Sequence, residues 1–462
     1  MHIKSEVFEG KRYRNLVKKL FKKKRYYKGI DINKFVLADI ATDFYIKNKK
    51  KNFFFKIYNY LQNTFSILKI VIKIFFFKTV LHFEYKGNLN IWFLYAPTKR
   101  PSLKKELIKD LKSKKIPHYV SWKNEINFYS FYENFKRLKF YFNNLLFNNF
   151  NFIDFKKNLL INYDILKLSD LEKDFNKQIK PKSVLSMKDF QRFENGIIQI
   201  SNLKNVPTFT TQHSVHHYFI KKNERIGNMM LSNSVSKNIL CWGEFNLKIY
   251  KYFNPQSNIF LTGAYLRPKK ISSNVISSKI SLIICLACNR RLPETIAILK
   301  KVNKISKFID EFNIIIRLHP SVNFAEYKKF INNFNLNFKY TVEFNKGEFK
   351  YSYKSNSIFI TGLSGVYYDL IYLGYKTIFY KFPYDLFEEL PRVLKPCKNE
   401  KDILNQINKL AKLKNSKWKK ISKKIVKKTL NHNILEVNDR SIIKDVFKII
   451  ENNKNNLNNF SY

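Results

Sequence analysis

The feature that most constrains the fold is a repeated alternation of short apolar runs with amphipathic, helix-patterned segments from residue 88 onward. Such alternation is typical of a parallel sheet whose strands are joined by crossover helices. Strands are expected at 90–97, 118–122, 183–187, 206–213, 238–243, 258–263, 281–288, 312–320, 357–361 and 376–381. Helices are expected at 102–112, 190–203, 293–312, 324–333 and 365–373. The sequence therefore predicts an α/β fold.

The alternation restarts after about residue 232, which predicts two Rossmann-like units in the 462-residue chain. We place the N-terminal, acceptor unit at 88–232 and the C-terminal, nucleotide-donor unit at 233–400. A basic and apolar accessory region (1–87) precedes them, and a basic helical tail (401–462) follows. Two doubly wound domains in tandem have a ligand cleft where the carboxyl ends of their strands face each other. Chemistry is therefore expected just after each strand.

The chain carries 86 Lys and Arg against 35 Asp and Glu, a formal net charge of +51. An excess this large implies an anionic partner, which is nucleic acid, an acidic membrane surface or a phosphorylated substrate. The aromatic content of 16% excludes a disordered polycation. AT-rich codons would also enrich lysine, although they do not explain the shortage of glutamate. No helix-turn-helix, RRM or KH signature is evident, so non-enzymatic nucleic-acid binding is kept only as an alternative.

Residues 53–83 are the most apolar part of the sequence, but their longest uncharged run, 57–68, has twelve residues. A membrane-spanning helix needs about twenty. On a helix, one narrow polar stripe would be formed by Asn59, Gln62, Ser66, Lys69 and Lys73. Either an interfacial membrane helix or a helix nearly buried in the protein fits this pattern.

Two basic runs with interleaved apolar residues, 11–28 and 414–428, favour contact with an anionic membrane surface. The N-terminus lacks the apolar core of a signal peptide. We therefore expect a cytoplasmic protein that is peripheral on the inner face of the cytoplasmic membrane.

Four cysteines are too few for a disulfide framework and indicate a reducing compartment. Cys285 and Cys288 form a CxxC pair inside the apolar run 281–288. A zinc site would need a second, suitably spaced pair of ligands, which the sequence lacks. We interpret both thiols as buried strand residues.

The first motif that carries chemistry is Thr-Thr-Gln-His-Ser-Val-His-His at 210–217, at the end of an expected strand. His213 is expected to face the cleft, where an imidazole of near-neutral pKa can deprotonate an acceptor hydroxyl. Gln212 and His216 are expected on the acceptor side. Three histidines within five residues could also bind a metal, although no carboxylate or cysteine is nearby. Zinc binding and a structural His213 are therefore the alternatives.

The second motif is Ile-Ile-Arg-Leu-His-Pro at 315–320, where Arg317 and His319 alternate and so share one face of a strand end. Arginine can clamp phosphate oxygens bidentately, and histidine can donate a hydrogen bond to a leaving phosphate. Arg290 and Arg291, after the run 281–288, could supply further phosphate contacts. The alternative is a surface arginine with a histidine satisfied inside the protein.

The third motif is Thr-Gly-Leu-Ser-Gly-Val-Tyr-Tyr-Asp at 361–369, between an expected strand and helix. Ser364 and Gly365 fall at the helix start, where free backbone N–H groups and the helix dipole attract phosphate. Thr361 ends the strand, and Asp369 lies one turn further on, where it could accept a hydrogen bond from a ribose hydroxyl. A serine N-cap before an ordinary helix would give the same sequence pattern. The third motif is therefore informative mainly because of its spacing after the second motif.

Five short motifs occur in order: Pro-Thr-x-x-x-Gln-His (207–213), Trp-Gly (242–243), Thr-Gly (262–263), Arg-x-His-Pro (317–320) and Thr-Gly-x-Ser-x-x-x-x-Asp (361–369). With them the sequence resembles bacterial surface-polysaccharide transferases of the GT-B fold. These include CDP-glycerol glycerophosphotransferase-like proteins and capsule and lipopolysaccharide glycosyltransferases with an HP motif. The resemblance covers about residues 180–400.

The resemblance implies transfer of a sugar or polyol phosphate from a nucleotide-activated donor to a glycan or lipid-linked acceptor. His213 would be the acceptor-side base, and Arg317, His319, Ser364 and Asp369 would hold the donor. It also implies an inverting, metal-independent reaction without a cofactor. The expected strand ends carry no DxD-like carboxylate pair, which agrees with metal independence.

The sequence departs from the family pattern at two positions. Ser214 stands where glycine commonly follows Gln-His, and Arg317 replaces the usual lysine while keeping its charge. A nucleotide-sugar epimerase of the same fold is the enzymatic alternative.

Overall fold

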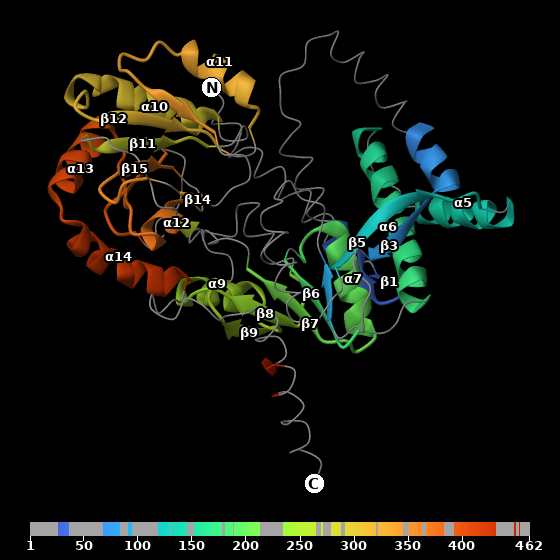
Figure 1. Ribbon diagram of the computed structural model, residues 1–462. Coiled ribbons are helices and arrows are strands. Elements are labelled where there is room, and N and C mark those ends of the chain that lie inside the picture. Colours follow the sequence, from blue (N-terminus) through green and yellow to red (C-terminus); the bar gives the residue numbers. More distant parts are fainter. Residues whose placement is uncertain are drawn as a thin grey trace.

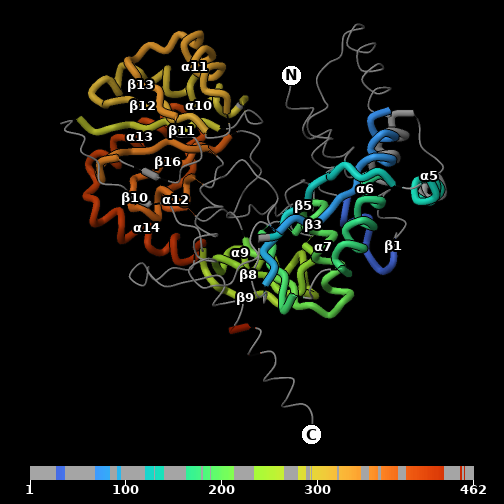
Figure 2. Tube along the Cα trace, turned by 45° about the vertical axis from the view of Figure 1, so that its right-hand side comes forward, coloured from blue at the N-terminus to red at the C-terminus, as the bar shows by residue number. Residues whose placement is uncertain are grey.

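The computed structural model shows two α/β units (Figures 1 and 2). Helices, strands and their connections are described for residues 26–36, 68–83, 91–94, 119–129, 131–145, 152–177, 181–187, 189–212, 234–264, 269–270, 279–287, 292–319, 322–344, 350–351, 353–362, 366–382, 392–430, 448–449 and 452.

The first unit is built on a seven-stranded sheet in the order β3-β5-β4-β6-β7-β8-β9. Its strands are β3 (Phe77–Phe83), β4 (Ile91–Leu94), β5 (Tyr119–Ile126), β6 (Ser183–Ser186), β7 (Thr208–Thr211), β8 (Asn238–Cys241) and β9 (Asn258–Leu261). All neighbours pair parallel except β3, which runs antiparallel to β5 at one edge. The predicted parallel sheet is thus confirmed, with an antiparallel edge strand added.

The second unit is built on a five-stranded, wholly parallel sheet in the order β13-β12-β11-β15-β16. Its strands are β11 (Ser281–Cys285), β12 (Asn313–Arg317), β13 (Thr341–Glu343), β15 (Ile358–Thr361) and β16 (Lys376–Phe379). Every residue of β11, β15 and β16 is buried. Helices cover both faces of such a sheet, which is why its strands are near-continuous apolar runs rather than alternating ones.

Helices follow the strands as crossover connections. They are α5 (Phe131–Leu145), α6 (Phe152–Lys177), α7 (Arg192–Leu203), α9 (Glu244–Phe253), α10 (Leu292–Lys304), α11 (Phe324–Asn332), α12 (Val366–Tyr372), α13 (Glu400–Lys412) and α14 (Asn415–Leu430). Unlabelled helices span 32–36 and 68–76. Two short ladders, β1 (Tyr26–Tyr27) with β2 (Ile30–Asp31) and β10 (Lys269–Lys270) with β14 (Lys350–Tyr351), lie outside the two large sheets. The expected helix 293–312 is shorter, because a 3₁₀ turn at Ser306–Phe308 follows α10.

The division between the units differs from the expected one at 232/233. We expected 238–243 and 258–263 to open the second unit, yet β8 pairs with β7 and β9 with β8 in the first sheet. The division falls between Leu261 and Ser281 instead. Alternation of strands and helices predicts that a strand forms but not which sheet edge it joins, because strand pairing is set by tertiary contacts.

The described part of region 1–87 belongs to the first unit and is not an accessory region. Ile30 and Phe35 are wholly buried in the same core as Leu168 and Ile197. Within 53–83, the described residues form the helix 68–76 and then strand β3, so a single helix is excluded for this part. Asn59, Gln62 and Ser66, which were expected on one polar stripe, lie outside the described residues.

Two aspartates of α6 cover the exposed edge of the first sheet. Asp170 Oδ2 accepts a hydrogen bond from Thr79 N at 3.3 Å, and Asp174 Oδ2 accepts one from Leu81 N at 2.6 Å. Four helical residues advance about 6 Å and two strand residues about 6.6 Å, so this spacing matches alternate N–H groups of β3. The edge is thereby protected from pairing with another strand.

Arg137 of α5 joins three elements at this edge. Its Nη1 donates to Asp170 Oδ1 at 2.7 Å, its Nε to Ile74 O at 3.0 Å and its Nη2 to Phe77 O at 3.2 Å. Burial raises the pKa of Asp170, while the charge of Arg137 and the hydrogen bond from it act in the opposite direction. The arginine therefore pairs with a buried carboxyl group and fixes α5 to helix 68–76.

The described residues of 401–430 are part of the second unit rather than a separate tail. Trp418 of α14 is wholly buried, and its indole Nε1 donates to Tyr375 O at 2.8 Å. At the other end of α14, Ala264 N donates to Leu430 O at 3.2 Å, so the helix reaches the first unit near α9 (Figure 1). The apolar face of this basic helix is thus used inside the protein.

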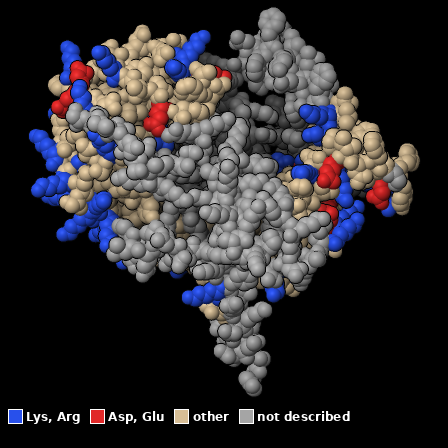
Figure 3. All heavy atoms as spheres, viewed as in Figure 1, with Lys and Arg blue, Asp and Glu red and all other residues tan. Residues whose placement is uncertain are grey.

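The lysines of α13 and α14 point outward. In Figure 3, Lys and Arg side chains line the side of the molecule that these two helices occupy in Figure 1. Among the described helices, none combines the length and apolarity that crossing a bilayer requires.

Replacing Arg137 tests how much this edge depends on it. Arg137→Ala should lower the free energy of unfolding by about 3 kcal/mol, since it leaves the Asp170 carboxylate buried without its partner. Urea denaturation measures this, with Lys136→Ala as the exposed control, which should stay within about 0.5 kcal/mol of the parent. Arg137→Leu combined with Asp170→Leu should recover part of the loss. Equal effects of Arg137→Ala and Lys136→Ala would contradict the assignment.

Candidate active site at the carboxyl ends of the strands

The order of the second sheet reverses at β11, which has β12 on one side and β15 on the other. Connections therefore leave β11 and β15 toward opposite sides, and a crevice for a ligand forms at this switch point in open α/β sheets. The register places Cys285 of β11 beside both Arg317 of β12 and Thr361 of β15. Arg317 of the second sequence motif and Thr361 of the third are thus brought together at the carboxyl ends of the strands, as predicted.

A glutamate that the sequence analysis did not single out lies at this switch point. Glu294, in the first turn of α10, is 3% exposed. It lies against Gly362, directly after β15, so closely that a Cβ at Gly362 would be 1.5 Å from Glu294 Oε1. Glycine is therefore required here by close approach. Acidic residues in first helical turns are too common for the sequence to have indicated this one.

The hydroxyl of Thr361 is buried at the end of β15. Its side chain is 0% exposed, and Oγ1 makes no hydrogen bond to any described residue. A buried hydroxyl without a partner is costly and is uncommon in folded proteins. On the other side of the switch point, Thr295 Oγ1 accepts a hydrogen bond from Ala287 N at 3.2 Å and fixes the chain that leaves β11.

Arg317 is held by side chains of its own unit. It is 8% exposed, and its Nη1 donates to Tyr353 Oη at 3.0 Å. The Tyr353 hydroxyl donates in turn to Glu343 Oε2, and Arg317 Nη1 is 4.0 Å from Glu343 Oε1. Burial raises the pKa of Tyr353, so its proton stays in this network. The expected role of Arg317 as a phosphate clamp stays a prediction. One of its guanidinium nitrogens, Nη1, already donates to Tyr353.

His319 and Asp369 flank this edge. His319 is half-buried two residues beyond β12, and its carbonyl accepts from Val322 N at 3.1 Å, which closes the turn before α11. Asp369 is half-buried in the first turn of α12. Four further predicted donor-site residues lie outside the described residues: Arg290, Arg291, Ser364 and Gly365.

Gln212 directly follows β7 in the first sheet. It is 1% exposed, its Oε1 accepts from Trp242 N at 2.8 Å, and its Nε2 donates to Asn246 Oδ1 at 2.6 Å. The side chain therefore ties the end of β7 to the turn between β8 and α9. His213 and His216 lie outside the described residues, so the acceptor side and the cleft between the units remain predictions.

The first sheet also reverses its order, at β4 between β5 and β6. Ser186, the last residue of β6, hydrogen-bonds to Glu194 in the first turn of α7. Glu194 is 1% exposed. Each switch point thus has a buried glutamate from the first turn of a following helix, and the sequence analysis had identified neither.

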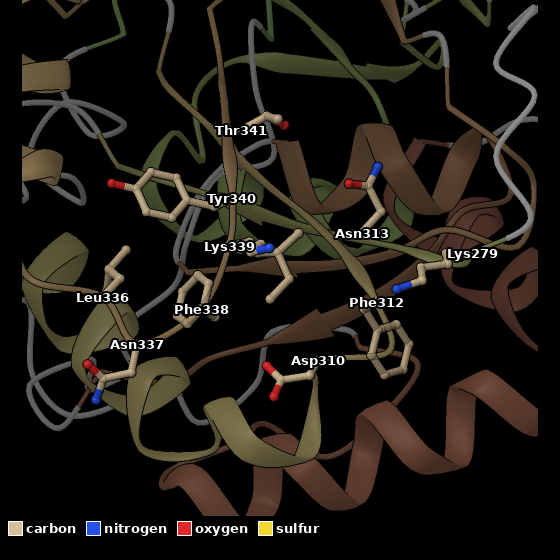
Figure 4. Close-up of a pocket in the computed structure, with 11 residues that line it drawn as sticks. Lys279, Asp310, Phe312, Asn313, Leu336, Asn337, Phe338, Lys339, Tyr340 and Thr341 are labelled. Atoms are coloured by element: carbon tan, nitrogen blue, oxygen red, sulfur yellow. The ribbon is translucent and has the colours of Figure 1, made fainter.

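An open pocket of about 900 Å³ lies at the amino ends of strands of the second sheet (Figure 4). Asn313 and Thr341, which line it, are the first residues of β12 and β13. It is therefore separate from the site at the carboxyl ends. Among the described residues, no group of three His, Cys, Asp or Glu side chains is placed to hold a metal ion.

No protein-family model matches the sequence, and no curated protein matches it. Similar solved structures include UDP-GlcNAc 2-epimerase from Neisseria meningitidis bound to UDP-GlcNAc, with 14% identity, 73% of this chain and 98% of that chain covered, and a TM-score of 0.41. MnaA of S. aureus with UDP has 11% identity, coverages of 72% and 91%, and a TM-score of 0.44. TarM has 12% identity, coverages of 62% and 58%, and a TM-score of 0.38. These scores lie below 0.5, so the fold assignment rests on the strand order and pairing of this chain.

Gly362→Ala tests the close approach at the switch point. The new methyl group would overlap the Glu294 carboxylate, so the free energy of unfolding should fall by about 1–3 kcal/mol. Chemical denaturation measures the change. Adding Glu294→Ala should remove most of the loss, and Glu294→Ala alone provides the control. A Gly362→Ala protein as stable as its parent would refute this contact.

Three of the four cysteines should be inert in the folded protein, and the fourth, Cys288, lies outside the described residues. Cys241, Cys285 and Cys397 are buried, and burial raises the pKa of each thiol to about 12. At pH 8 roughly one in ten thousand of these thiols would then be ionised, and alkylation requires the thiolate. Mass spectrometry after iodoacetamide treatment should find these three unmodified in native protein and modified in urea. Rapid native labelling of Cys285 would contradict its burial.

Proposed function

We propose that the protein is a GT-B-like transferase that moves a sugar, or a polyol phosphate, from a nucleotide-activated donor to a bacterial surface glycan. The donor diphosphate would lie at the carboxyl ends of β11, β12 and β15. The acceptor would approach from the first unit, on the side of His213. No metal and no cofactor is required in this proposal.

The observation that carries the proposal is the unsatisfied hydroxyl of Thr361 at the switch point of the second sheet. It lies at the strand end beside Gly362, in the position where open α/β sheets bind ligands. Arg317 ends β12 on one side of β11, with His319 two residues beyond it, and Thr361 ends β15 on the other side. A phosphate oxygen placed between them would give the Thr361 hydroxyl its missing acceptor.

The reaction in the sugar-transfer case follows from these groups. The acceptor oxygen attacks the anomeric carbon, the bond from that carbon to the phosphate oxygen breaks, and the nucleoside diphosphate leaves with the bonding electrons. His213 takes the acceptor proton, because a near-neutral imidazole is a suitable general base. His319 donates a hydrogen bond to the leaving phosphate, and the buried positive charge of Arg317 stabilises the negative charge that develops there.

Nucleotide binding is the first test. The full-length protein should show a raised Tm with one class of nucleoside diphosphate from a panel of cytidine, uridine, guanosine and adenosine forms. Thr361→Val keeps the shape but removes the buried hydroxyl that lacks a partner, so the unliganded Tm should be no lower than that of the parent while the nucleotide-induced shift shrinks. No stabilisation by any nucleotide would contradict the proposal.

Turnover is the second test. His319→Ala should lower kcat for transfer by about 100-fold or more, the usual effect of losing a hydrogen-bond donor to charge that develops in the transition state. His82→Ala, a half-buried histidine on β3 away from the site, is the matched control. Isomerisation of a free nucleotide sugar without any acceptor would instead favour the epimerase alternative, and unchanged transfer by His319→Ala would overturn the assigned role.

A further inference from the structure

Helix 68–76 exposes a stripe of large apolar side chains. Leu68, Ile72 and Phe76 recur every four residues and so share one side of the helix. They are 55%, 43% and 41% exposed, and Val71 between them is 39% exposed. Such side chains are normally turned into the core, as Ile70 and Ile74 of the same helix are.

The stripe continues onto the end of β5 and the start of α5. Ile126, Phe128, Phe131, Tyr132 and Phe135 are all more than half exposed, with Phe131 at 88%. Phe76 and Phe128 join the two parts, because their rings pack edge to face with centroids 5.8 Å apart. Asn127 N also donates to Phe76 O at 2.8 Å. We call these nine residues the apolar face.

The apolar face is concentrated and firmly held. It contains nine of the sixteen large hydrophobic side chains that are exposed among the described residues, so it is not scattered surface hydrophobicity. Arg137 bonds α5 to the carbonyls of Ile74 and Phe77 at the end of helix 68–76. The two helices are therefore held in a fixed relation, and the contact of Phe76 with Phe128 joins their apolar side chains.

The apolar face lies at the β3 edge of the first sheet. The second unit adjoins the opposite edge, where α14 contacts α9 beside β9. In Figures 1 and 2, α5 lies at the end of the first unit away from the second sheet. The apolar face can therefore engage a large partner without covering the carboxyl ends of the second sheet.

Lysines surround the apolar face. Lys69 and Lys73 flank the stripe on helix 68–76, and Lys136 and Lys139 follow it on α5, with Lys136 Nζ 4.0 Å from the centre of the Tyr132 ring. The acidic residue nearest to them in α5, Glu133, is 3.9 Å from Lys136 Nζ. Positive charge around an exposed aromatic surface complements the anionic head groups of a lipid bilayer.

We propose that the apolar face docks on the surface of an anionic lipid bilayer, with Phe128, Phe131 and Phe135 entering the interface between head groups and acyl chains. A second copy of the chain is the other candidate occupant. A two-fold interface would oppose identical lysines, in a chain that already carries a net charge of +51. The charge therefore favours lipid, and this inference does not depend on the proposed transferase activity.

Vesicle sedimentation of the full-length protein tests the proposal. The protein should pellet with vesicles of phosphatidylcholine and phosphatidylglycerol, less with phosphatidylcholine alone, and less at high salt. Phe131→Ser with Phe135→Ser should lower the partition coefficient about tenfold or more, because apolar area is lost from the contact. Tyr252→Ser with Phe308→Ser, which changes two exposed aromatics elsewhere, should leave binding unchanged.

The lysines beside the apolar face are tested by a second matched pair of variants. Lys136→Gln with Lys139→Gln should weaken binding by about fivefold for each lysine, whereas Lys423→Gln with Lys424→Gln on α14 should have little effect. Near-UV circular dichroism confirms that each variant is folded. Equal losses in the two lysine pairs, or equal binding of the two aromatic pairs, would overturn the proposal. So would a dimer in sedimentation velocity that Phe131→Ser with Phe135→Ser dissociates.

Discussion

The contact between Glu294 and Gly362 spans the switch point of the second sheet. It joins the start of α10, which follows β11, to the residue after β15, across the point where the strand order reverses. The absence of a side chain at Gly362 lets a buried carboxylate reach the sheet edge. Thr361, the residue before Gly362, pairs with Cys285 of β11, which pairs in turn with Arg317. The candidate donor site therefore adjoins a position that only a residue without a side chain fits.

The sequence predicted the main strands of the second sheet well, because burial on both faces makes each of these strands a continuous apolar run. The apolar runs 281–288 and 357–361 became β11 and β15 with small changes at their ends. It did not predict that β8 and β9 belong to the first sheet, since local patterns carry no information on which edge a strand joins. Strand β13, only three residues long, was also missed because it is too short for any periodicity.

The site was predictable where it follows strand ends and unpredictable where it depends on packing. Arg317 and Thr361 were expected at one edge, and parallel pairing through β11 places them there. The partner of Arg317, Tyr353, is 36 residues away in sequence, and nothing in its local pattern indicates the pairing. Glu194 and Glu294 resembled ordinary acidic residues at helix starts, so only their burial distinguishes them.

The two halves of the molecule meet at two crossings, which are the chain itself at 262–280 and a non-covalent contact between the end of α14 and the first unit. The second crossing is backbone against backbone, since a Cβ at Gly243 would lie 2.5 Å from Lys428 O. Such a contact has no flexible side chains between the two backbones. Any displacement of the halves at this point would therefore have to move the backbone of Gly243 or that of α14.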